Sequence, residues 1–145
     1  MRLIVYGTLR RGEPLSHALP KGGKYETIEV SGLQLYVLGA CPGAKLGTRE
    51  DKAVVELWEF DCSKKVEIKL LHRLDLMEGV SWGLYKRSYI NTPKGKALIY
   101  TICDDMKGYL RIKDWKKWQK KSRKEQWRLL REAGSAKEVA VYHLV

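Results

Sequence analysis

Two short segments of the sequence carry residue types that could do chemistry. The first is VYGTLRRG, at residues 5–12, and the second is LDLMEG, at residues 74–79. A glycine turn after a strand can offer backbone N–H groups to an anion, and a carboxylate such as that of Glu78 can move protons. Read alone, the first segment could equally be a simple turn out of the first strand.

A nucleotide phosphate is a poor match for the glycine turn. A P-loop needs a second glycine followed by Lys and Ser or Thr, and a dinucleotide fingerprint needs three glycines that open a helix. This segment holds only Gly7 and Gly12, and Pro14 follows closely. The turn is therefore suited to an anion other than a nucleotide phosphate.

Several strands and one helix must position these two segments. The hydrophobic pattern predicts strands over 2–6, 24–37 with a bend at Gly32, 53–60, 86–91 and 97–102, and the TPKG turn predicts that the last two form a hairpin. It predicts a helix over about 64–74, capped by Asp61 or Ser63, with an apolar face formed by Val66, Leu70, Leu71 and Leu74. It also predicts a short helical turn near Ser16 and His17 and a turn-rich segment over 39–47. Because strands and helices do not alternate strictly, we expect an α+β fold, a small mixed β-barrel, closed or partly closed, with inserted helices.

The last third of the chain is strongly basic. Residues 111–131 hold ten Lys and Arg residues against Asp114 and Glu125, in a chain of net charge +11. The spacing of Trp115 and Trp118 predicts a basic helical extension over about 109–134 whose tryptophans dock on the barrel. Its basic face could contact nucleic acid or simply be solvated. A final strand is expected within residues 137–145.

Length and composition set further expectations. A chain of 145 residues has the size of one ordinary domain, so we expect a single domain over residues 1–145. No apolar run is long enough to span a membrane, and no export signal is evident. The three cysteines and three histidines show no ligand spacing. These features predict a cytoplasmic protein with reduced thiols, no metal and no cofactor.

Taken together, the motifs resemble a known family. YGTLRRG, LDxxEG, a Tyr–x–Arg strand start at Tyr85 and a later strand with Tyr100 are the pattern of the gamma-glutamylcyclotransferase-like proteins, which include gamma-glutamylamine cyclotransferases and AIG2-like proteins. LQLYVLGACPGA and AVVELWEF resemble the segments between these motifs. The resemblance covers about residues 2–103. It departs from the family pattern at Glu56, where many relatives have glycine, and at Ser16 and His17.

The resemblance implies an enzyme that cyclises a gamma-glutamyl amine or amino acid to 5-oxoproline and releases the amine, without a cofactor. It implies that Glu78 is the catalytic general acid and base, while Asp75 serves the helix end. It also implies a set of substrate-binding residues: Tyr6, Gly7, Thr8, Leu9 and Tyr85.

The chemistry agrees with these residue types. A gamma-glutamyl compound contains its own nucleophile, the alpha-amine, so ring closure needs mainly the right substrate geometry and a base. One carboxylate could take the ammonium proton and then return it to the leaving nitrogen. An apolar wall would raise its pKa toward neutrality, and we expect Met77, Val80 and Trp82 to form that wall. We expect Arg10 and Arg11 to be solvated.

An alternative is a non-catalytic protein that keeps the family fold as a binding module. Its basic C-terminal helix would then contact nucleic acid or an acidic protein through phosphate or carboxylate groups. The two interpretations differ at Glu78, because replacing this residue by Gln abolishes 5-oxoproline release only if the protein is an enzyme.

Overall fold

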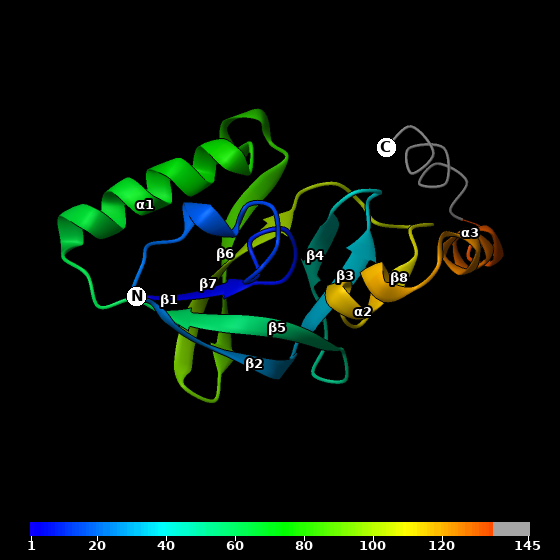
Figure 1. Ribbon diagram of the computed structural model, residues 1–145, viewed down its shortest axis with the longest axis horizontal. Helices are drawn as coiled ribbons and strands as arrows, with labels where there is room; N and C mark the ends of the chain where they lie inside the picture. The colour runs from blue at the N-terminus through cyan, green and yellow to red at the C-terminus, as the bar shows by residue number, and fades with distance from the viewer. Residues whose placement is uncertain (135–145) are drawn as a thin grey trace.

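The computed structural model describes residues 1–134, which form two β-sheets and a set of short and long helices (Figure 1). The strands are β1 (Arg2–Val5), β2 (Lys24–Ser31), β3 (Leu33–Val37), β4 (Pro42–Leu46), β5 (Lys52–Glu59), β6 (Tyr85–Thr92), β7 (Gly95–Ile102) and β8 (Arg111–Ile112). One sheet has the order β2-β5-β1-β7-β6, and the other has the order β4-β3-β8.

Strand β1 lies in the middle of the larger sheet. It pairs antiparallel with β5 and parallel with β7, while β6 and β7 form the predicted hairpin. Leu3 and Ile4 are 0% and 2% exposed and belong to different hydrophobic clusters. Successive side chains of a strand point to opposite faces, so both faces of β1 are covered. The turn that follows β1 is therefore anchored to the central strand of the sheet.

Helix α1 (Lys64–Met77) lies across one face of this sheet (Figure 1). The Ser63 side chain accepts a hydrogen bond from the Val66 N–H at 3.3 Å, which caps the helix as the sequence predicts. Leu70 and Leu74 are buried against the sheet, in agreement with the predicted apolar face. Val66 is an exception to that prediction, because it is 45% exposed.

The smaller sheet begins where the chain bends out of β2. Gly32 has φ of +86°, the left-handed region that glycine adopts without strain, and this produces the predicted bend between β2 and β3. The segment expected to be turn-rich contains strand β4 instead, with Ala44 opposite Leu35 of β3. The Pro and Gly residues of this strand obscured its strand pattern in the sequence. Tertiary packing nevertheless holds the strand in place and buries Ala44 completely.

The expected barrel closure is not observed. Among residues 1–134, β2 and β6 are the outer strands of the larger sheet, and no strand ladder joins that sheet to the smaller one. The bend at Gly32 explains this arrangement, because it directs β3 into a separate sheet instead of extending the first. The fold is thus a mixed α+β arrangement of two sheets.

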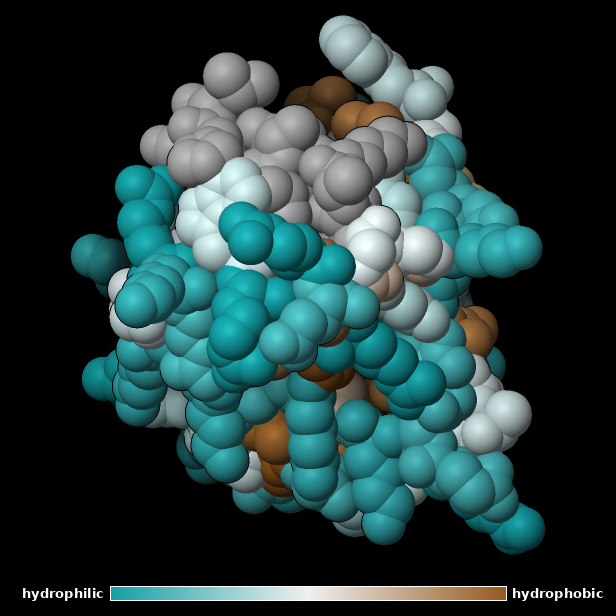
Figure 2. Space-filling view, turned by 90° about the vertical axis from the view of Figure 1, so that its right-hand side faces the viewer, coloured by the Kyte–Doolittle hydropathy of each residue, from teal (hydrophilic) through white to brown (hydrophobic). Residues whose placement is uncertain are grey.

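The basic segment forms α2 (Trp115–Lys120) and α3 (Arg123–Glu132) beside the smaller sheet. Trp115 and Trp118 are each 2% exposed and pack with Val37 of β3 and Leu130 of α3. The surface over these helices is mostly hydrophilic (Figure 2). The strand expected within residues 137–145 lies outside the described residues. Within residues 1–134, no helix combines the length and apolar character needed to cross a membrane.

The protein also contains two short 3-10 helices. Helix η1 (Ser16–Ala18) forms the predicted helical turn, and η2 (Val80–Trp82) follows directly after α1.

Candidate active site

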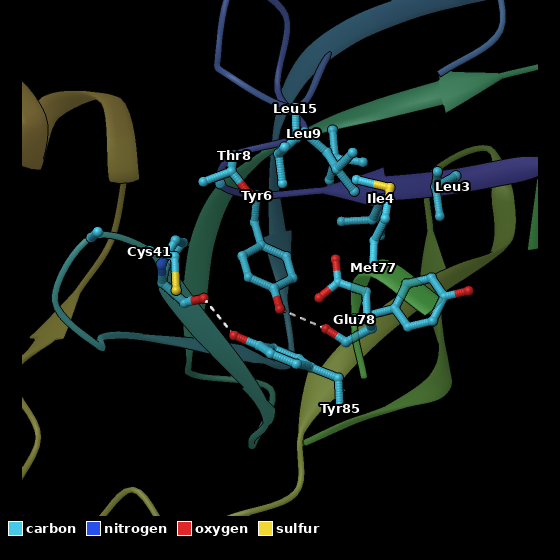
Figure 3. Close-up of a pocket in the computed structure, with 15 residues that line it drawn as sticks. Leu3, Ile4, Tyr6, Thr8, Leu9, Leu15, Cys41, Met77, Glu78 and Tyr85 are labelled. Atoms are coloured by element: carbon cyan, nitrogen blue, oxygen red, sulfur yellow. Dashed lines mark hydrogen bonds between the residues drawn. The ribbon is translucent and has the colours of Figure 1, made fainter. Parts of the chain in front are cut away.

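A cavity of about 290 Å³ opens beside the carboxyl end of β1. Its walls come from β1 and the following turn, the segment that enters β4, the end of α1, and strands β6 and β7 (Figure 3). The structure brings all of the predicted site residues to this one cavity: Tyr6, Gly7, Thr8, Leu9, Glu78 and Tyr85. Residues more than seventy positions apart in the sequence therefore share a single site.

The turn after β1 presents unused backbone donors. It is closed by a hydrogen bond from the Arg10 N–H to the Gly7 carbonyl at 2.9 Å. In the part of the chain that the structure describes, no acceptor is recorded for the N–H groups of Gly7, Thr8 or Leu9. These N–H groups can bind a carboxylate or a developing oxyanion.

Gly7 is required by a close approach rather than by its backbone conformation. Its φ is outside the left-handed region, but a Cβ atom at this position would lie 2.4 Å from Cγ of Pro42. No real side chain fits at that distance. Pro42 belongs to the CPG segment, so this contact packs the YGTL turn directly against that segment.

Glu78 is placed by the end of α1. Its N–H donates to the Leu74 carbonyl at 2.9 Å, and Gly79 follows with φ of +63°. A left-handed glycine ends many helices, and here a Cβ on Gly79 would also lie 2.7 Å from Leu84. The Glu–Gly pair thus ends the helix at the cavity, and Figure 3 shows the Glu78 carboxylate pointing into it.

Glu78 is the one charged side chain among the described residues that line the cavity. Burial raises the pKa of its carboxyl to about 7. Burial also raises the pKa of Tyr6 and of Tyr85, so both phenols stay protonated. The Tyr6 hydroxyl donates to the Tyr100 carbonyl at 2.7 Å, and the Tyr85 hydroxyl donates to the Pro42 carbonyl at 3.1 Å. Glu78 is therefore the lining group best suited to exchange protons near neutral pH.

Cys41 also lines the cavity, but its environment does not activate it. Burial raises the pKa of the Cys41 thiol, and a nucleophilic cysteine needs a lowered one. Within residues 1–134, no group of three His, Cys, Asp or Glu side chains is placed to hold a metal ion.

Asp75 anchors the end of α1 to the sheet, as expected from the sequence. Its Oδ1 accepts hydrogen bonds from Arg87 Nε at 2.9 Å and from the Tyr100 hydroxyl at 2.6 Å. The hydrogen bonds from Arg87 lower the pKa of Asp75, so it stays ionised. Sequence reasoning missed the role of Arg87, although the Tyr–x–Arg motif contained the signal: an Asp and an Arg that belong to one pattern are candidates for an ion pair.

The predicted apolar wall is only partly correct. Met77 lines the cavity, whereas Val80 packs against the cluster under α1. Trp82 is 84% exposed, so it forms no part of the wall. Two left-handed glycines, Gly79 and Gly83, flank η2 and turn this segment toward solvent.

The prediction that Arg10 is solvated is wrong. Arg10 is 3% exposed, and its Nε lies 3.2 Å from Oε2 of Glu56. Glu56 is 1% exposed and does not line the cavity, so its departure from the family pattern leaves the charge of the cavity unchanged. Local sequence gave no sign of this pair, because the two residues are 46 positions apart.

Comparisons with known proteins identify relatives of the chain. The family model for "Gamma-glutamyl cyclotransferase, AIG2-like" matches residues 3–129, which include helix α2. The gamma-glutamylcyclotransferase family protein YtfP of Escherichia coli K12 is 30% identical over 117 residues, which are 79% of this chain and 96% of YtfP.

Two solved structures have the same fold. An uncharacterised protein of Pyrococcus horikoshii is 32% identical, with a TM-score of 0.63 over 82% of this chain and 92% of the other. The solution NMR structure of Escherichia coli YtfP is 30% identical, with a TM-score of 0.58 over 79% and 93%. The chain belongs to the gamma-glutamyl cyclotransferase, AIG2-like family.

Proposed function

We propose that the protein is a gamma-glutamylcyclotransferase that converts a gamma-glutamyl amine or amino acid into 5-oxoproline and the free amine. The observation that carries the proposal is a single carboxyl, that of Glu78, with a pKa of about 7 inside the cavity and opposite a turn with free N–H groups. Membership in a family named for this activity supports it.

In this reaction the Glu78 carboxylate removes a proton from the substrate alpha-ammonium. The free amine attacks the gamma-carbonyl carbon, and the new C–N bond closes a five-membered ring. Charge builds up on the carbonyl oxygen, where backbone N–H donors stabilise it. Protonated Glu78 then gives its proton to the leaving nitrogen as the old C–N bond breaks and the carbonyl re-forms. The ring nitrogen passes its remaining extra proton to the released amine, which departs as an ammonium ion. One carboxyl therefore ends the cycle in the state in which it began.

The pKa of Glu78 suits both halves of this cycle. A group with a pKa near the working pH is a good base before the proton transfer and a good acid after it. An ordinary glutamate, with its pKa of 4.5, would be a weaker base toward an ammonium group. Holding the amine and the carbonyl together supplies much of the remaining rate, on the order of 7 to 11 kcal/mol in well-oriented systems.

The non-catalytic alternative is not favoured. The matching family is named for an enzymatic activity, and part of the basic segment is engaged within the protein: Asp114 and Lys116 contact residues that follow the active-site turn.

The test is release of 5-oxoproline from gamma-glutamyl amino acids, gamma-glutamyl-epsilon-lysine and glutathione. Glu78→Gln should lower kcat by about a thousandfold, because Gln cannot transfer the proton. Glu67→Gln is the matched control, since Glu67 lies on the same helix outside the cavity. Failure of the wild type to release 5-oxoproline from any substrate, or near-normal turnover by Glu78→Gln, would contradict the proposal.

A further inference from the structure

A buried group of charges lies behind the active-site turn. The side chains of Arg10 and Glu56 are 4% and 2% exposed. Glu56 accepts hydrogen bonds from Arg10 Nε at 3.2 Å, from the Arg11 backbone N–H at 2.7 Å and from Trp58 Nε1 at 3.2 Å. Buried charges are costly unless they are paired, so Glu56 holds the Arg10 side chain and the Arg11 backbone against β5.

Helix α2 completes this group from the other side. Oδ1 of Asp114 accepts from Arg10 Nη1 at 3.0 Å and also from the Lys116 N–H at 3.0 Å, which caps the helix. Nζ of Lys116 donates to the Arg11 carbonyl at 2.6 Å and lies 3.6 Å from Oε2 of Glu56. Asp114, the N-cap residue of α2, and Lys116 in its first turn therefore contact the two residues that directly follow the active-site turn.

Arg10 connects this buried group of charges to the turn that faces the cavity. Its side chain is held by Glu56 and Asp114, while its backbone N–H closes the turn onto the Gly7 carbonyl at 2.9 Å. The free N–H groups of the turn lie between that carbonyl and Arg10. Moving Arg10 would therefore reorient the donors that face the cavity.

We propose that Arg10, Asp114 and Lys116 are positioning residues for the turn formed by residues 6–9, so that the basic C-terminal segment supports the substrate site from outside the cavity. The proposal rests on the function proposed above, which makes this turn a substrate-binding element. Among the basic residues of α2, Lys116 then holds the turn, and the remaining lysines of the helix face solvent.

The experiment breaks the connection without removing the helix. Asp114→Ser keeps a good N-cap residue but shortens the side chain that reaches Arg10. Lys116→Met is a second variant, at a more exposed position where folding is less at risk. Lys120→Gln is the control, because Lys120 lies on the same helix and is exposed. The substrate is the best gamma-glutamyl compound found for the wild type.

Both variants should lower kcat/KM about tenfold, because the turn donors that bind the substrate and the developing oxyanion lose their geometry. The pKa seen in the pH profile of kcat should stay at the wild-type value, because Glu78 is not touched. Hydrogen exchange of the Arg10 amide, followed by NMR, should be at least about tenfold faster, while exchange of Leu3 and Ile4 stays unchanged.

Wild-type kcat/KM and wild-type Arg10 exchange in both variants would overturn the proposal. Equal acceleration of exchange at Leu3 and Ile4 would also overturn it, because the connection would then serve general stability. If the wild type releases no 5-oxoproline, the proposed function fails, and the exchange of the Arg10 amide still decides whether α2 positions the turn.

Discussion

Arg87 donates a hydrogen bond from Nε to Oδ1 of Asp75 at 2.9 Å, and this ion pair joins the start of β6 to the last turn of α1. Asp75 lies three residues before Glu78, so the pair fixes the helix end that carries the carboxyl of the active site. The Tyr100 hydroxyl reinforces it from β7 at 2.6 Å.

The stability of the protein should depend on this pair at low pH. Arg87 lowers the folded-state pKa of Asp75 below its ordinary value of 3.8. The unfolded chain therefore binds the proton more readily, and the stabilisation is complete above that value and is lost as the pH falls through the folded pKa. Arg87→Gln should flatten the pH dependence of the free energy of unfolding below about pH 4.

Urea denaturation at several pH values between 3 and 6 measures this effect. Arg49→Gln is the control, because Arg49 is exposed. An unchanged pH dependence in Arg87→Gln would show that the pair does not act on stability.

Glu78 should lower the stability of the protein above neutral pH. Its folded-state pKa of about 7 exceeds the ordinary value of 4.5. Between these values the folded state binds more protons than the unfolded state, so stability falls as the pH rises from about 4.5 to 7. Glu78→Gln carries no charge and should be more stable than the wild type at pH 8 by about 1 to 3 kcal/mol.

Denaturation of both proteins at pH 5 and pH 8 checks this expectation. The difference in free energy of unfolding between Glu78→Gln and the wild type should be larger at pH 8. If the difference is the same at both pH values, the carboxyl does not have the raised pKa.

Gly7 should tolerate no side chain unless Pro42 is also changed. A Cβ atom at position 7 would overlap the Pro42 ring, so Gly7→Ala should displace the turn and lower kcat/KM by about a hundredfold. Pro42→Ala removes the ring atoms involved, and the double variant Gly7→Ala/Pro42→Ala should recover part of the loss. Measuring kcat/KM for the wild type, the two single variants and the double variant completes a double-mutant cycle. Purely additive effects of the two changes would mean that the contact with Pro42 is not the reason for glycine.

Local pattern in the sequence was enough to predict most of the larger sheet. The α1 helix, its Ser63 cap and the β6–β7 hairpin follow from periodicity and turn residues, which act over a few positions. Strand β4 did not, because its PGAKL sequence has a weak strand pattern and is held by pairing with β3. Whether the outer strands of the larger sheet stay open depends on how the two sheets pack together. The hydrophobic pattern along the sequence does not predict that packing.

The site also has features that the local sequence predicts and features that it does not. The end of α1 at Glu78 is encoded locally by Gly79, and the resemblance to a family supplied the turn that faces it. The burial of Arg10 depends on Glu56 and Asp114, which are 46 and 104 positions away, so no window of sequence could reveal it. Trp82 was misplaced because apolar character alone does not show on which side of a glycine-flanked turn a side chain will lie.

The position of Glu78 at the carboxyl end of α1 has one more consequence. The aligned peptide dipoles of a helix place partial negative charge at its C-terminus, which disfavours a carboxylate there by about 0.3 to 1 kcal/mol. This field acts in the same direction as burial, and it comes from the backbone of the fourteen residues of α1 rather than from the walls of the cavity. Side-chain changes that reshape the cavity for another leaving amine would therefore leave this part of the proton affinity of Glu78 in place.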